Sequence, residues 1–218
     1  MGEDAGQVAR FEDRRWTERP QRPEWRHQAA VDLIRAEPVL DIGGGDGLLL
    51  RMLAEGGLTR LSLADVSPVA VETARSAGFE AEVADVTRGL PYPDASFGTV
   101  SALDVLEHLY DPLAALREMA RVGRELVIVV PNFHHWRARA QMLVGITPFQ
   151  SRPERGHVHW FNPSALRALL RDAGLVVETE LYQATGRLGL LGGPLARIRP
   201  GLFAGSIAVR ARTATSGR

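Results

Sequence analysis

The stretch V-L-D-I-G-G-G-D-G, Val39–Gly47, decides the fold of this chain. Its first four residues predict a short strand, its glycines predict a tight turn, and the following L-L-L-R-M-L-A-E predicts a helix. Glycine lets the backbone take a positive φ and lets a ligand approach closely, and the turn leads to free N–H groups at a helix N-terminus. This order of strand, glycine turn and helix predicts a corner that binds a nucleotide-type ligand.

The spacing of the glycines indicates which kind of nucleotide fits. The dinucleotide fingerprint G-x-G-x-x-G needs a glycine at its sixth position, where this chain has Leu48. The glycines here are Gly43, Gly45 and Gly47, and Asp41 lies near the strand end. A carboxylate there repels a pyrophosphate and attracts a cationic ligand, which disfavours an NAD-linked dehydrogenase. A glycine turn without any ligand stays open as an alternative, because short glycine motifs recur by accident.

The composition is that of an ordinary globular chain. Its 218 residues suit one domain, with 45% hydrophobic and 24% charged residues. The formal net charge of zero gives no broad electrostatic footprint for nucleic acid. No apolar run approaches the length of a membrane span, and the polar N-terminus has no signal-peptide core. We therefore expect no nucleic-acid partner, no membrane partner and a cytoplasmic location.

Two residue types are missing from the chain. The sequence contains no cysteine, which excludes disulfides, thiolate nucleophiles and cysteine metal sites. All 26 residues of the lysine-plus-arginine total are arginine. Schiff-base enzymes and Walker-type P-loops both require a lysine, so both classes are excluded.

An acidic residue closes the second predicted strand, residues 60–65. Asp65 follows the glycine turn by roughly 20 residues, where a carboxylate in a βαβ unit can accept hydrogen bonds from both ribose hydroxyls. As an alternative, Asp65 caps the helix that follows, although Ser67 before Pro68 already supplies such a cap.

The third predicted strand, residues 79–84, is followed by another acidic residue. Its alternation of apolar and acidic residues is typical of a strand at a sheet edge. Asp85 could accept a hydrogen bond from an adenine amine, and the Val86 N–H could donate to a ring nitrogen. Two successive strand ends closed by Asp strengthen the prediction of a nucleoside site.

Strands and helices alternate along the rest of the chain. The predicted strands are residues 97–104, 126–130, 175–182 and 203–212, and the predicted helices begin at about Glu24, Pro68, Pro112 and Pro163. This alternation predicts an α/β fold with a doubly wound sheet, helices on both faces and ligands at the carboxyl ends of the strands.

One domain, residues 24–212, is predicted between two flanking segments. Residues 1–23 are polar and aperiodic, which predicts a flexible N-terminal arm that is either plainly disordered or closes over a ligand as a lid. Residues 213–218 are expected to be a disordered tail. Within the domain, residues 132–162 contain a basic, aromatic amphipathic helix and are interpreted as an insertion that covers the substrate.

The D-x-G-x-G-x-G turn, Asp65, Asp85 and the stretch P-Y-P-D-A-S-F together resemble the class I S-adenosylmethionine (SAM)-dependent methyltransferases, over about residues 25–212. The stretches V-P-N-F-H-H-W-R-A-R and P-G-L-F-A are most similar to the MetW-like proteins of methionine biosynthesis. The resemblance implies a Rossmann-like, seven-stranded and mostly parallel sheet whose last strand is antiparallel. It also implies SAM as the cofactor and S-adenosylhomocysteine as the product.

The same resemblance implies which residues surround the cofactor. The turn would hold its methionine part, the second and third strand ends its ribose and adenine, and the fourth strand end its ammonium. The residues concerned are Asp41, Gly43, Gly45, Gly47, Asp65, Val66, Asp85, Val86, Leu103 and Asp104.

The expected activity is the transfer of a methyl group from SAM to a small-molecule acceptor, by a monomer or a homodimer. An acceptor that must lose a proton needs a general base, for which His108, His157 and His159 are the candidates, although each could serve only in packing. The alternative is a MetW-like SAM-binding partner subunit of a homoserine O-acyltransferase, with no methyl transfer of its own.

A divalent metal site is a further alternative. Asp104, Glu107 and His108 form a D-x-x-E-H cluster that His157 or His159 could complete. Carboxylate and imidazole groups suit Mg²⁺, Mn²⁺ or Fe²⁺, and some SAM methyltransferases use a similar E-x-x-E-H set. The expected set of site residues nevertheless includes no metal ligand, because E-H-L at this place also resembles methyltransferases that use no metal.

Overall fold

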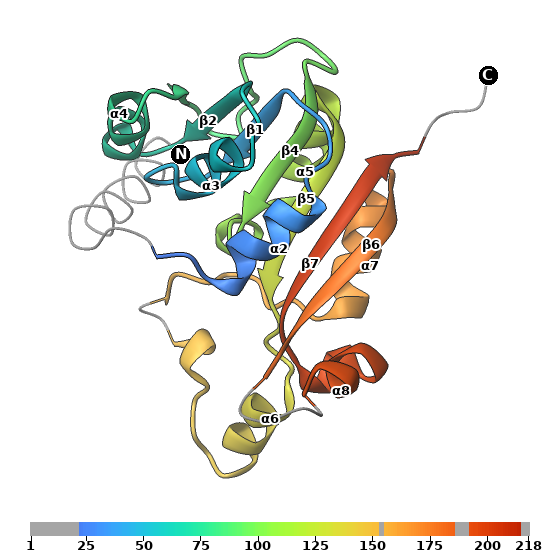
Figure 1. Cartoon of the computed structure of the whole chain (residues 1–218). Helices are drawn as coiled ribbons and strands as arrows, with labels where there is room; N and C mark the ends of the chain where they lie inside the picture. Colours follow the sequence, from blue (N-terminus) through green and yellow to red (C-terminus); the bar gives the residue numbers. More distant parts are fainter. Residues whose placement is uncertain (1–21, 153–154, 186–191, 215–218) are drawn as a thin grey trace.

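The computed structural model describes residues 22–152, 155–185 and 192–214, which form a twisted sheet with helices on both faces (Figure 1). The strands are β1 (Val39–Ile42), β2 (Leu61–Asp65), β3 (Glu80–Val83), β4 (Phe97–Leu103), β5 (Gly123–Pro131), β6 (Leu175–Ala184) and β7 (Ala204–Thr213). The helices are α2 (Trp25–Leu33), α3 (Leu48–Glu55), α4 (Pro68–Ser76), α5 (Pro112–Val122), α6 (Trp136–Leu143), α7 (Pro163–Asp172), α8 (Gly192–Ile198) and α9 (Pro200–Phe203). Two short 3-10 helices are η1 (Leu106–His108) and η2 (Phe149–Ser151). Most of the predicted arm and tail lies outside the described residues.

The sheet has seven strands in the order β3-β2-β1-β4-β5-β7-β6. Strands β1 to β5 pair in parallel, whereas β7 runs antiparallel to both β5 and β6. The predicted Rossmann-like fold with an antiparallel last strand is confirmed. The third strand lies at a sheet edge, as its alternating pattern predicted.

Three helices begin at the predicted prolines, each directly after a capping residue. Ser67, Asp111 and Asn162 each precede a proline at the first helical position, and each side chain accepts a hydrogen bond from the backbone N–H three residues later. Such caps satisfy a donor that the helix itself leaves unpaired. The predicted starts of α4, α5 and α7 at Pro68, Pro112 and Pro163 are therefore confirmed.

The fifth strand is longer than the sequence predicted. Its apolar run suggested residues 126–130, but β5 begins at Gly123, which pairs with Phe97 of β4. Glu125 pairs with Arg212 of β7 on the other side. Pairing on both sides extends the strand beyond its apolar centre, which a hydrophobic pattern does not reveal.

Alternate residues of the central strands enter two cores, one on each face of the sheet. Val127 and Val129 of β5 pack with apolar residues of α2, α3 and α4. Leu126, Ile128 and Val130 pack with apolar residues of α5 and α7. This two-sided burial fixes the strands in register and leaves the carboxyl ends of the parallel strands to build a site.

Helix α6 and the segment after it lie below the carboxyl ends of β4 and β5 in Figure 1, where they are coloured yellow. The predicted helix in residues 132–162 is thus confirmed. A bilayer-spanning segment would require a helix longer and more apolar than any in the described part of the chain.

Candidate functional site

The glycine turn joins β1 to α3 with left-handed backbone at three positions. The φ angles are +67° at Gly43, +58° at Gly45 and +76° at Gly47, so each predicted glycine takes a conformation that other residues rarely adopt. The Gly43 N–H donates to the Ala64 carbonyl of β2 at 2.8 Å. The turn is therefore attached to the neighbouring strand end.

Asp65, at the end of β2, connects this turn to the start of α4. Its side chain is buried, with 4% of the residue exposed. One carboxylate oxygen accepts from the Gly45 N–H at 3.1 Å, and the other accepts from the Ser67 N–H at 2.9 Å. Because Ser67 is the N-cap of α4, the alternative in which Asp65 caps that helix is wrong.

Asp41 of β1 lies beside Asp65 in the same buried region, with 2% of its surface exposed. The Ser101 hydroxyl of β4 donates to one Asp41 carboxylate oxygen at 2.7 Å. Burial raises the pKa of Asp41 to about 7, and the charge of Asp65 acts in the same direction. The carboxylate of Asp65 and the partly ionised carboxyl of Asp41 form a local anionic centre that favours a cationic ligand.

Gly44 is a residue of the turn that the sequence analysis missed. A Cβ at this position would lie 2.6 Å from an Asp41 carboxylate oxygen and 2.7 Å from the Leu63 side chain. Only glycine therefore lets the turn pass this closely over Asp41. The D-x-G-x-G-x-G spacing includes only Gly43, Gly45 and Gly47. The need for glycine at position 44 comes from a tertiary contact with Asp41, which a sequence spacing does not reveal.

Asp85 and Val86 follow β3 next to this centre. The Ala84 N–H donates to the Asp65 carbonyl at 3.0 Å, which connects the ends of β2 and β3. One Asp85 carboxylate oxygen accepts from the Thr87 N–H at 2.9 Å and from the Thr87 hydroxyl at 2.6 Å. Val86 is buried in the core. The third strand end thus adds a partly exposed carboxylate to the same rim.

Asp104 follows β4 and has a φ of +54°, a strained value for a residue other than glycine. One of its carboxylate oxygens accepts from the Arg26 guanidinium of α2 at 2.5 Å. Leu103, the last residue of β4, pairs with Val129 of β5. Sequence reasoning missed Arg26, because nothing in the local pattern of α2 indicates a partner so distant in the chain.

A second group of side chains lies in and beyond η1, just after Asp104. One ligand atom from each of Glu107, His108 and His157 lies within 4.8 Å of the other two. The two imidazole rings are 4.7 Å apart between centroids, and Glu107 is buried. His159 is not part of this group, and its Nε2 is 3.3 Å from the Tyr110 carbonyl oxygen. The structure thus brings together two of the three predicted histidines.

The segment 156–161 returns from the insertion to η1. The N–H groups of Val158 and His159 donate to the Glu107 carbonyl at 2.8 and 3.1 Å, and the Phe133 N–H donates to the Phe161 carbonyl at 3.0 Å. By contrast, the end of α6 is in solvent, with Leu143 87% exposed. Within 132–162, the returning segment therefore contacts the site, whereas the end of α6 does not.

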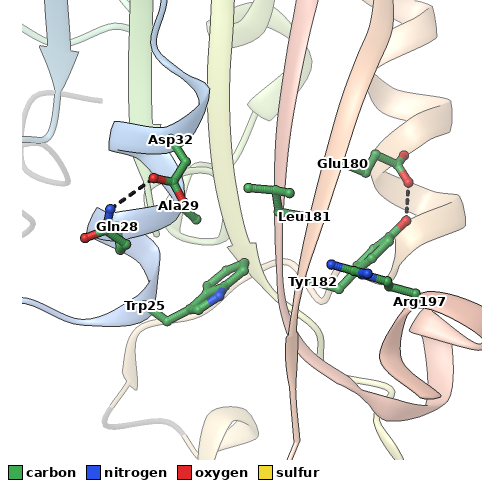
Figure 2. Close-up of a pocket in the computed structure, with 8 residues that line it drawn as sticks. All are labelled: Trp25, Gln28, Ala29, Asp32, Glu180, Leu181, Tyr182 and Arg197. Carbon is green, nitrogen blue, oxygen red and sulfur yellow. Dashed lines mark hydrogen bonds between the residues drawn. The ribbon is translucent and has the colours of Figure 1, made fainter. Parts of the chain in front are cut away.

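A cavity of about 220 Å³ lies between α2, β6 and α8, and Figure 2 draws the side chains that line it. Its lining residues are Trp25, Gln28, Ala29, Asp32, Glu180, Leu181, Tyr182 and Arg197. None of these is a predicted site residue. The predicted residues converge instead at the carboxyl ends of β1, β2, β3 and β4.

Comparison of the sequence with known protein families and proteins shows which family this chain belongs to. A model described as a methyltransferase domain matches residues 9–180. The ubiquinone biosynthesis O-methyltransferase of Xanthomonas oryzae pv. oryzae is 33% identical over 162 residues, which cover 69% of this chain and 66% of that protein. The chain thus spans just under two thirds of the length of the curated relatives that it matches first.

Solved structures give the same fold. A SAM-dependent methyltransferase from Thermotoga maritima aligns with a TM-score of 0.65 at 17% identity, covering 87% of this chain and 88% of that one. The [4+2]-cyclase SpnF aligns with a TM-score of 0.65 at 19% identity, covering 90% of this chain and 85% of that one. Because one of these proteins is a cyclase, the fold alone does not determine the reaction. The family and these relatives give no support to the MetW-like resemblance.

Proposed function

Because this chain belongs to the methyltransferase-domain family, whose class I members use SAM, we propose that it transfers the methyl group of SAM to a small-molecule acceptor. SAM is the cofactor that this membership implies. S-adenosylhomocysteine would leave as the product. The observation that carries the proposal is the buried pair Asp41 and Asp65 under the glycine turn, at the carboxyl ends of adjacent parallel strands.

The nucleoside half of SAM suits the ends of β2 and β3. Each carboxylate oxygen of Asp65 can accept a second hydrogen bond beside the backbone N–H that it already accepts, and the ribose hydroxyls are suitable donors. We place Val66 beside the ribose. Asp85 and the Val86 N–H would then receive the adenine, the carboxylate accepting from its amine.

The methionine half suits the glycine turn and the end of β4. SAM carries an ammonium, a carboxylate and a sulfonium, and no phosphate. Arg26 and Asp104 present opposite charges in contact with one another, which matches the two charged groups of an α-amino acid. The ammonium would meet Asp104 or the Leu103 carbonyl, and the carboxylate would meet Arg26.

The acceptor is proposed to bind beside His108, His157 and His159, after the end of β4. The curated relatives are named O-methyltransferases, so a hydroxyl is the acceptor group to test first. In an in-line displacement the hydroxyl oxygen attacks the methyl carbon, the C–S bond breaks, and its electron pair goes to sulfur. One of the three histidine imidazoles, acting as general base, takes up the hydroxyl proton. The residues beside it position the oxygen and exclude water.

The test is turnover of methyl-labelled SAM with a panel of phenolic and catecholic acceptors, with S-adenosylhomocysteine as the measured product. The protein should form this product with at least one acceptor, and Asp65→Asn should abolish it. Asp172→Asn, the same change on exposed α7, should leave the rate unchanged.

The alternative, a SAM-binding partner subunit of a homoserine O-acyltransferase, makes the opposite prediction. SAM would bind with no product from any hydroxyl acceptor, and the acyltransferase would co-purify with this chain. That combined result would contradict the proposed methyl transfer.

A further inference from the structure

We infer that Arg121 of α5 is a positioning residue, which holds the loop between β3 and β4 in the conformation that recognises adenine. This loop, residues 84–96, is called the β3–β4 loop below. It begins with Asp85 and Val86, the two residues proposed to receive the adenine. The role of Arg121 rests on the proposed function, because adenine enters this site only as part of SAM or of its product.

The guanidinium of Arg121 makes five hydrogen bonds, which equals its number of N–H donors. Nε and one terminal nitrogen donate to the two carboxylate oxygens of Glu118, at 2.9 and 2.6 Å. The same terminal nitrogen donates to the Leu90 carbonyl at 3.1 Å. The other donates to the Tyr92 carbonyl at 2.8 Å and to the Asp94 carboxylate at 2.7 Å. With every donor used, the side chain is fixed in one orientation.

Glu118 completes the contact between α5 and the β3–β4 loop. It lies three residues before Arg121, on the same face of the helix. Its Oε1 accepts from the Leu90 N–H at 2.6 Å, so both backbone polar groups of Leu90 are bonded to this pair. The hydrogen bond from Arg121 holds the pKa of Glu118 below its ordinary value, and the carboxylate therefore stays charged at neutral pH.

The backbone of Arg121 binds the same loop. The Ala95 N–H donates to the Arg121 carbonyl at 2.8 Å. This carbonyl lies in the last turn of α5, where a helix leaves its carbonyls without a partner of its own. Four of the six residues from 90 to 95 are thus hydrogen-bonded to Arg121, namely 90, 92, 94 and 95. The second half of the loop is attached to α5 through this one residue and Glu118.

The first half of the β3–β4 loop carries the proposed adenine contacts. At its start, the Ala84 N–H donates to the Asp65 carbonyl of β2 at 3.0 Å. The side chains of Val86 and Leu90 are 5% and 6% exposed and enter the same core as the apolar residues of α5. Val86 therefore lies between an attachment to β2 and an attachment to α5. A shift of Leu90 away from α5 would move the Val86 N–H, although Arg121 itself does not reach the adenine.

Adenine recognition depends closely on this placement. In the proposed site the Asp85 carboxylate accepts from the adenine amine, and the Val86 N–H donates to a ring nitrogen. Hypoxanthine has a carbonyl oxygen in place of the amine and a hydrogen on that ring nitrogen, so it repels both groups. Hydrogen bonds weaken steeply when distance and angle leave their narrow range. A displaced loop should therefore lose the preference for adenine over hypoxanthine.

The test is calorimetric titration of the full chain with S-adenosylhomocysteine and with S-inosylhomocysteine, its hypoxanthine analogue. We expect the wild type to bind the adenine ligand at least about tenfold more tightly. Arg121→Gln, which keeps two of the five donors, should reduce this preference at least about threefold. Arg121→Lys, with three donors and the charge, should keep more of the preference than Arg121→Gln.

Arg117→Gln is the matched control, because it makes the same change one turn earlier on α5. Arg117 is exposed and donates to the Asp172 carbonyl of α7, away from the β3–β4 loop. It should keep the wild-type preference. The assignment is overturned if folded Arg121→Gln keeps the full preference, or if it loses the same factor for both ligands, which would indicate a general loss of structure.

Glu118→Gln decides the matter if Arg121→Gln fails to fold. It keeps an oxygen that can accept from the Leu90 N–H and removes the charge that holds Arg121. A reduced preference for adenine supports the assignment, and an unchanged preference overturns it. A wild type that binds both ligands equally also overturns it and leaves the proposed methyl transfer standing. A wild type that binds neither ligand contradicts the proposed function itself.

Discussion

The burial of Asp41 predicts a specific pH dependence of stability. Its carboxyl has a pKa near 3.8 in an unfolded chain, and burial next to Asp65 raises the pKa to about 7 in the folded protein. Between these values the folded state holds a proton that the unfolded state has lost. The free energy of unfolding therefore falls as pH rises through this range, by about 1.4 kcal/mol per pH unit from this group.

The total effect follows from the same two pKa values. Protonated Asp41 contributes its full advantage below pH 3.8, and that advantage is gone above pH 7, a difference of about 4 kcal/mol. Asp41→Asn keeps an oxygen that can accept the Ser101 hydrogen bond but cannot ionise. The variant should therefore lack this part of the pH dependence.

The assay is equilibrium urea denaturation of the wild type and of Asp41→Asn at pH 5, 6, 7 and 8. The comparison of the two proteins at each pH removes the contribution of every other group. Relative to the variant, the wild type should lose about 1.4 kcal/mol per unit between pH 5 and 7, and little above that. A difference between the two proteins that stays constant from pH 5 to 8 would refute the reasoning.

Two further predictions concern the turn and the end of β4. Gly44→Ala should lower the free energy of unfolding by about 1–3 kcal/mol in urea denaturation, because its Cβ would overlap the Asp41 carboxylate. Gly193→Ala in α8, where the Cβ meets nothing within 4 Å, should cost nothing, and equal losses in the two variants would contradict this explanation. Arg26→Gln should weaken SAM binding about tenfold in calorimetry, near 1.4 kcal/mol, while exposed Arg35→Gln has no effect. Unchanged affinity in Arg26→Gln would remove that guanidinium from the site.

Much of the fold was predictable from the sequence, because local signals and tertiary structure agree. The glycine turn at Val39–Gly47 and the caps at Ser67, Asp111 and Asn162 use conformations that few residues allow, so the sequence reveals them directly. The edge position of β3 followed from its alternating pattern. The start of β5 did not follow from its sequence, because its first residues are extended by pairing with neighbours and not by their own hydrophobicity.

The candidate site was predictable only where its residues lie in one motif. Asp41, Asp65 and Asp85 each lie at or near the end of a strand, so the sequence alone predicted that they meet. Arg26 and His157 reach the site from distant segments, through an ion pair and through backbone hydrogen bonds. No spacing in the sequence encodes such contacts. For this reason the sequence analysis missed Arg26 as the partner of Asp104, and it could not choose between His157 and His159 as the residue that joins Glu107 and His108.

The most direct test of the account is isothermal titration calorimetry of the wild type and of Asp65→Ala with SAM, S-adenosylhomocysteine and NAD. We predict that the wild type binds SAM and S-adenosylhomocysteine with a Kd on the order of micromolar, about −8 kcal/mol, and does not bind NAD. The affinity of folded Asp65→Ala for SAM should be at least about tenfold lower. Equal affinity of the two proteins for SAM, or binding of NAD in place of SAM, would contradict the claim that the carboxylates at this edge of the sheet hold the methyl donor.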